Sequence, residues 1–152
     1  MKTIMYTFAA FTTMVALSPL TTPAQADDKA DRASLVGSWV QNGGSAAWII
    51  DSRADGLHVT QIEGSGPVAD FQCNTEGQSC DIKIGGHKAS VSMYYNGPAL
   101  VQLETKGDQI VKRRFSILPS GNSMKVEVTP MTGRVQTEQL EFERGQPAVH
   151  VK

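Results

Sequence analysis

Residues 35–42 read LVGSWVQN, and this stretch opens a regular pattern that continues to the end of the chain. From here on, runs of five to nine residues rich in Val, Ile, Tyr, Phe and Thr alternate with short clusters of Gly, Pro, Asn and Asp. Runs of this length and composition, bounded by turn residues, predict β-strands. The expected strands are 35–41, 46–52, 57–63, 68–73, 80–85, 90–95, 100–105, 110–118, 124–130 and 135–143.

The separators between these runs indicate how the strands pair. They are short, as in RADG, GSGP and KGDQ, and such connections join antiparallel neighbours but cannot carry a parallel crossover. No segment after residue 35 keeps a helical apolar period over twelve residues. We therefore predict an all-β fold, an antiparallel up-and-down meander closed into a small barrel of about 8–10 strands, because closure removes the two open edges.

Alternation along each run predicts which side chains face the core. In LVQLET (100–105), Val101 and Leu103 share one face, and Gln102 and Glu104 share the other. Strands that are apolar on one side only are typical of sheets with one dry and one solvated face. We expect the first pair to face the core and the second pair to face water.

The two ends of the pattern contain residues suited to close a barrel. If the first strand pairs with the last, Trp39 lies near Phe142 and Arg144, and Arg144 shares the inward parity of Phe142. A guanidinium over an indole ring is attracted by about 0.5–2 kcal/mol, and Gly37 allows a close approach. The simpler alternatives are that Trp39 is an ordinary core aromatic and that Arg144 is a solvated strand end.

This combination of Gly37-Ser38-Trp39 in the first strand and Arg144 in the last resembles the calycin group, which includes lipocalins, fatty-acid-binding proteins and avidin-like barrels. The stretch IGGHKASVSMYYNGPALVQLETKGDQIVKRRFSILPSGNSMKVEV (84–128) is similar to small exported bacterial lipocalin-like proteins. The resemblance implies a barrel that binds a small hydrophobic or amphipathic ligand.

The first 26 residues have the features of a signal peptide. Lys2 precedes an apolar stretch, prolines follow it, and Ala24-Gln25-Ala26 matches a cleavage site. The alternative is a retained anchor, but the apolar stretch is short for a stable membrane span. We expect a signal peptide (1–26), a spacer of at most one helical turn (27–34), one barrel domain (35–144) and a C-terminal tail (145–152), in a periplasmic or secreted protein.

Two cysteines, Cys73 and Cys80, flank the turn-like sequence NTEGQS. In an exported chain a close, even pair predicts a disulfide, worth about 2–3 kcal/mol for so short a ring. A metal site would need further ligands, for which only His87 lies nearby, and redox sites usually space their cysteines as C-x-x-C.

Charge and motifs exclude several functions. Removal of Lys2 with the leader leaves 13 basic and 15 acidic side chains without a basic stripe, which argues against nucleic-acid binding. Hydrolase, zinc-protease and nucleotide-binding motifs are absent from the sequence, and the three histidines are scattered. We expect no cofactor, no metal and no enzymatic activity.

One charged residue breaks the alternation. In IVKRRFSIL (110–118), Arg113 shares the face of Val111, Phe115 and Ile117. The simpler interpretation is a bulge that resets the alternation, or a rim position from which Arg113 reaches water. The alternative is an interior guanidinium that needs a carboxylate, carbonyls, water or an anionic ligand. Under it, a small hydrophobic or anionic amphiphile would bind Arg113 and rest on a wall formed by Trp48, Ile50, Met93, Tyr95, Phe115 and Val126.

Three functions are therefore weighed. The first is an exported barrel that binds a hydrophobic or amphipathic ligand. The second is an extracytoplasmic interaction module or hydrolase inhibitor with a protein partner, which would have a filled core and act through a loop or through residues 27–34. The third, an enzyme, would make Glu138 and Arg113 the first pair to inspect.

Overall fold

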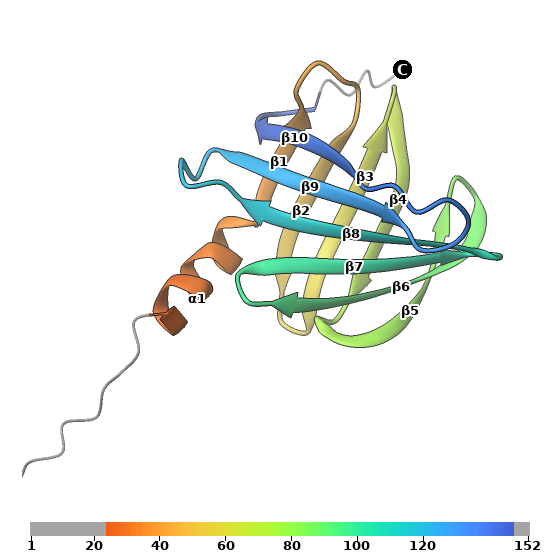
Figure 1. Cartoon of the computed structure of the whole chain (residues 1–152), viewed down its shortest axis with the longest axis horizontal. Helices are drawn as coiled ribbons and strands as arrows, with labels where there is room; N and C mark the ends of the chain where they lie inside the picture. Colours follow the sequence, from red (N-terminus) through yellow and green to blue (C-terminus); the bar gives the residue numbers. More distant parts are fainter. Residues whose placement is uncertain (1–23, 148–152) are drawn as a thin grey trace, which may run out of the picture.

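The structure is a computed structural model, and it describes residues 24–147. One helix, α1 (Ala24–Ser34), precedes ten antiparallel strands (Figure 1). The strands are β1 (Gly37–Gln41), β2 (Ala47–Arg53), β3 (Gly56–Glu63), β4 (Gly66–Cys73), β5 (Glu76–Ile84), β6 (His87–Asn96), β7 (Ala99–Lys106), β8 (Gln109–Ile117), β9 (Ser123–Pro130) and β10 (Glu138–Arg144).

The strands form one sheet in the order β4-β3-β2-β1-β10-β9-β8-β7-β6-β5. Apart from β4 and β5, strands that are neighbours in sequence pair with each other, and β1 also pairs with β10, so the predicted all-β antiparallel meander is confirmed. The sheet curls into a nearly closed barrel (Figure 1). Its discontinuity lies between β4 and β5, which are neighbours in sequence but are not paired as strands.

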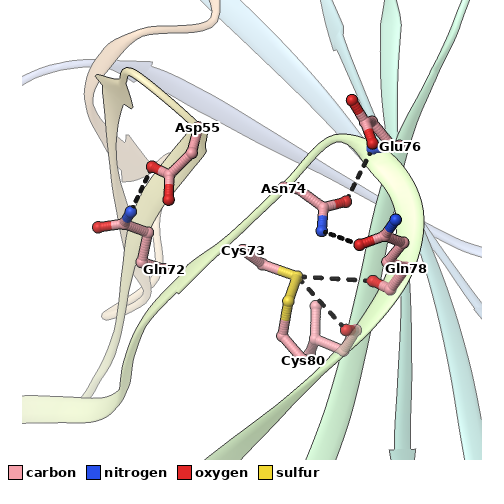
Figure 2. The surroundings of a disulfide bond; sticks show 8 residues. Asp55, Gln72, Cys73, Asn74, Glu76, Gln78 and Cys80 are labelled. Carbon is pink, nitrogen blue, oxygen red and sulfur yellow. Dashed lines mark hydrogen bonds between the residues drawn. A yellow bond between two sulfur atoms is a disulfide. The ribbon is translucent and has the colours of Figure 1, made fainter.

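Two links hold the β4 and β5 edges together. At one end Gly85 N donates to Val68 O at 2.7 Å. At the other end Cys73 and Cys80 form the predicted disulfide, with their Cα atoms 5.8 Å apart (Figure 2). The covalent bond therefore joins two strand edges where ladder hydrogen bonds are missing, and it reduces the exposure of edges that invite pairing with other chains.

We call the end of the barrel where β1 begins and β10 ends the floor, and the opposite end the mouth. At the floor Trp39 lies directly across from Arg144, and the guanidinium carbon lies 4.3 Å from the centre of the indole ring. Trp39 is fully buried, while Arg144 covers it from the solvent side. Gly37 has a φ of +138°, and a Cβ there would lie 2.6 Å from an Arg144 nitrogen, so the close approach needs glycine.

Helix α1 replaces the spacer that we expected at 27–34. It has no apolar stripe, but Arg32 in its last turn complements the helix dipole. Arg32 Nε donates to Gly97 O at 2.9 Å, and the buried Leu35 follows the helix into the core. The helix lies outside the floor (Figure 1), and no helix in residues 24–147 is long and apolar enough to cross a membrane. The expected signal peptide falls mostly outside the described residues.

The core is continuous and fills the floor half of the barrel with large side chains such as Trp39, Met93, Met124 and Phe142. The expectation for 100–105 was wrong. On β7 it is Leu100, Gln102 and Glu104 that share the face of the core residue Phe115 across the β7–β8 pair, so polar groups point into the barrel.

Candidate binding site in the mouth of the barrel

A cavity of about 160 Å³ lies inside the mouth half of the barrel. Strands from both sides of the barrel supply its walls, and most of the lining residues have the inward parity of their strand. Seven of the lining residues are apolar and four are polar or charged. The lining residues are Ala46, Trp48, Gln61, Ile62, Glu63, Arg113, Val126, Val128, Glu138, Leu140 and Phe142.

Arg113 lies in the cavity wall and already has a partner. The β8 register runs without interruption through this residue, so the interpretation as a bulge was wrong. Its Nη1 donates to Glu104 Oε2 at 2.5 Å, and the two side chains are only 13% and 11% exposed. The carboxylate that a buried guanidinium requires therefore comes from the protein itself.

Trp48 forms the aromatic part of the wall. The Arg113 guanidinium carbon lies 5.8 Å from the centre of the Trp48 ring, within the range of a cation–π contact. The Phe115 ring meets Trp48 edge-on, with ring centres 5.1 Å apart. Phe115 is buried and does not line the cavity, so it supports the position of Trp48.

Of the other predicted lining residues, Val126 also lines the cavity, while the buried Ile50 does not. Met93 is fully buried in the core. Tyr95 lies under helix α1, where the Arg32 guanidinium carbon is 4.8 Å from its ring centre. Burial raises the pKa of the Tyr95 hydroxyl, and the positive charge of Arg32 partly opposes this rise. The structure thus brings Trp48 and Arg113 together at the cavity and separates Met93, Tyr95 and Phe115 from it.

Gln61 is a cavity residue that sequence reasoning missed. It lies opposite Trp48 in the β2–β3 pair and is 5% exposed. Its Nε2 donates to Glu63 Oε1 at 2.8 Å, while its buried Oε1 accepts no hydrogen bond from any described residue. An unsatisfied buried acceptor costs about 1–3 kcal/mol. The signal that could have found Gln61 is its shared parity with Leu57 and Val59.

Two carboxylates, Glu63 and Glu138, lie at the exposed rim of the cavity. Within residues 24–147 neither has an ion-pair partner. Since Arg113 is neutralised by Glu104, the charge that remains among the residues lining the cavity is negative. The cavity therefore combines an apolar wall with hydrogen-bond acceptors.

A larger depression of about 590 Å³ lies outside the barrel beside the disulfide. Its lining is mostly polar. Several of these polar side chains are already hydrogen-bonded to each other: Gln72 donates to Asp55, and Asn74 donates to Gln78 (Figure 2). Small-molecule sites are mostly apolar and enclosed. The cavity in the mouth is the better candidate for this reason.

This chain is similar to known proteins in its structure but not in its sequence. No family model matches the chain, and no curated protein matches its sequence. Among solved structures it is similar to a secretary abundant heat soluble (SAHS) protein from Ramazzottius varieornatus, with a TM-score of 0.63 and 9% identity over 74% of this chain and 96% of that one. It is also similar to Echinococcus granulosus fatty-acid-binding protein 1, with a TM-score of 0.57 and 8% identity over 74% of this chain and 98% of that one. At such low identity the likeness concerns the fold alone, and the fold of this chain is that of the calycin-like β-barrels.

Proposed function

We propose that this protein is an exported barrel that binds a small hydrophobic or amphipathic molecule in the cavity of its mouth. The observation that carries the proposal is the composition of the cavity: an apolar wall with a few buried polar groups, open at the mouth. Ligand sites in proteins usually have this composition. The fatty-acid-binding protein among the structural neighbours supports the general class of ligand.

The volume limits what the cavity can enclose. A dry cavity of about 150 Å³ holds a molecule of roughly the size of benzene, and this cavity measures about 160 Å³. The enclosed part of the ligand is therefore about one ring or a short branched chain in size. A longer ligand would extend through the mouth into solvent.

Tryptophan fluorescence tests this proposal directly. Trp48 lies in the cavity wall, so a ligand should change its emission when a panel of small amphiphiles is titrated. In Trp48→Phe the emission change should disappear, while calorimetry should still detect binding. If neither fluorescence nor calorimetry responds to any member of a broad panel, the proposal fails.

Export is the second part of the proposal. The Cys73–Cys80 disulfide is compatible with an oxidising compartment, and the leader-like sequence predicts processing after Ala26. N-terminal sequencing of protein from the extracytoplasmic fraction should begin at Asp27. Protein that keeps its first 26 residues, or that is found only in the cytoplasm, would contradict this part.

A specific observation also favours an interaction module as a second candidate. The loop between β9 and β10 exposes two large apolar side chains, Met131 at 49% and Val135 at 62%, while the floor half of the barrel is filled. A photo-crosslinking residue at position 135 should capture one partner if this loop binds protein. Inhibition of a captured hydrolase by the purified protein would support this candidate, and its loss in Met131→Ser would locate the contact.

A further inference from the structure

The cavity has no free positive charge to receive an anionic ligand. Arg113 is the one cationic side chain in the lining, and its guanidinium is bound to Glu104. A carboxylate that approached Arg113 would also approach the negative charge of Glu104, and it would have to displace a partner held in a poorly solvated site. The anionic amphiphile that the sequence suggested therefore fits this cavity poorly.

The amide of Gln61 has only one chemically sensible orientation. A carboxylate only accepts hydrogen bonds, so the side of the amide that faces Glu63 must be its NH₂ group. The Oε1 atom then lies on the other side, buried and without a donor among the described residues. Because Gln61 lines the cavity, a small rotation of its amide would turn this acceptor toward a donor group of a bound ligand.

The rim of the cavity adds negative charge, which also favours a ligand group that donates hydrogen bonds. Glu63 and Glu138 lie on β3 and β10, which flank the opening, and the described residues place no cation beside either of them. A positively charged group in the mouth would be attracted to both carboxylates.

We propose that the polar end of the ligand is a protonated amine, which donates a hydrogen bond to Gln61 Oε1 and is balanced by Glu63 and Glu138. Its apolar part packs on Trp48 and on the neighbouring wall. This inference rests on the proposed function, because it names the chemical class of the ligand for the same cavity.

Three probes of similar size test the inference: 2-phenylethylamine, 2-phenylethanol and 3-phenylpropionate. Each places one ring in the cavity, and the three differ in the charge and donor capacity of the polar end. Binding to the disulfide-bonded protein is measured by calorimetry at low and moderate salt. The amine should bind at least about tenfold more tightly than the carboxylate, as expected where a hydrogen bond to a charged group is gained. Its affinity should fall as salt rises, because the rim carboxylates are exposed.

Two variants separate the contribution of the hydrogen bond to Gln61 from that of the negative charge at the rim. Gln61→Leu should weaken amine binding about tenfold and should leave carboxylate binding nearly unchanged. Glu138→Gln removes one rim charge and should weaken amine binding about threefold. The matched control is Glu141→Gln on the same strand, because Glu141 is exposed and does not line the cavity, and it should bind like the parent protein.

The outcomes distinguish the inference from the proposed function. If 3-phenylpropionate binds as tightly as 2-phenylethylamine or more tightly, and Gln61→Leu does not change the order, the inference is wrong while the binding function stands. If none of the three probes binds and no other amphiphile does, the proposed function fails as well. Tighter amine binding that is lost in Gln61→Leu and retained in Glu141→Gln supports the inference.

Discussion

Replacement of Glu104 by Gln removes one negative charge from the barrel interior and keeps the size of the side chain. Glu104 Oε2 accepts a hydrogen bond from Arg113 Nη1, and both side chains are largely withdrawn from solvent. The variant leaves the guanidinium with a neutral amide that offers a weaker acceptor. The interior guanidinium of Arg113 then has no carboxylate partner among the described residues.

The size of the expected loss in stability follows from the environment of the Glu104–Arg113 pair. At an effective dielectric constant of about 20, two unit charges about 4 Å apart attract by roughly 4 kcal/mol. Much of this is offset by desolvation in the native pair, but the desolvation of Arg113 remains when its partner is neutralised. Because both side chains keep a little exposure, we expect Glu104→Gln to lower the free energy of unfolding by about 3 kcal/mol, near the lower end for a broken buried pair.

Equilibrium unfolding in urea, followed by tryptophan fluorescence, measures this loss. It should also appear as a fall in the melting temperature of roughly 10 °C. The control is Glu127→Gln, because Glu127 lies 3.8 Å from Arg114 and that pair is considerably more exposed. This control should cost less than about 1 kcal/mol.

A double variant separates the pair from its context. Glu104→Leu combined with Arg113→Met replaces the two charges with apolar groups and should recover most of the stability lost in Glu104→Gln. The free Arg113 in Glu104→Gln should also strengthen the binding of 3-phenylpropionate. The reasoning would be refuted if the free energies of unfolding of Glu104→Gln and of the parent protein differed by less than about 0.5 kcal/mol, which is the scatter of neutral surface changes. The interior pair would then not be poorly solvated.

Three further predictions concern the floor, the disulfide and pH. Arg144→Met should lower stability by about 2 kcal/mol in urea unfolding, because the guanidinium donates to three backbone carbonyls, and Arg144→Lys should recover less than half of this. Replacing Cys73 and Cys80 together by Ser should lower stability by about 2–3 kcal/mol, and reduction of the parent protein should give the same loss. Burial raises the pKa of Tyr95 in the folded protein, so its contribution to stability is complete below about pH 10 and declines as pH rises from there through the raised pKa. Ultraviolet titration should show late ionisation of Tyr95, and Arg32→Gln should delay it further, because the charge of Arg32 lowers this pKa; an earlier ionisation would contradict this account.

Local patterns in the sequence were sufficient for the existence of the strands and for their pairing, except between β4 and β5. Alternating β-branched and aromatic residues separated by short turns leave few options except an antiparallel meander. The spacing of Cys73 and Cys80 was likewise sufficient for the disulfide. The inward parity of Arg113 was visible too, but its partner was not, because Glu104 lies on a different strand and had been assigned to the solvent side.

Helix α1 and the orientation of β7 were beyond such patterns. The helix lacks an apolar period, and it is held by contacts of Arg32 with residues more than sixty positions away in the chain. On β7 both faces are buried. Leu100 lies in the core, and Val101 on the outer face is buried as well, on a strand that helix α1 contacts. Alternation alone then cannot tell the inner face from the outer one.

The order of apolar and turn residues along the chain thus determined by itself that this protein is an all-β barrel with a disulfide, because strand periodicity and tight turns are short-range properties. Tertiary structure decided where the barrel is filled, where it is hollow and which charged groups line the hollow. Those properties depend on register between distant strands, which places Gln61 beside Trp48 and Glu104 beside Arg113. The polarity of the cavity follows from these cross-strand neighbours, because a buried polar group can bind a ligand only if no neighbouring side chain already satisfies it.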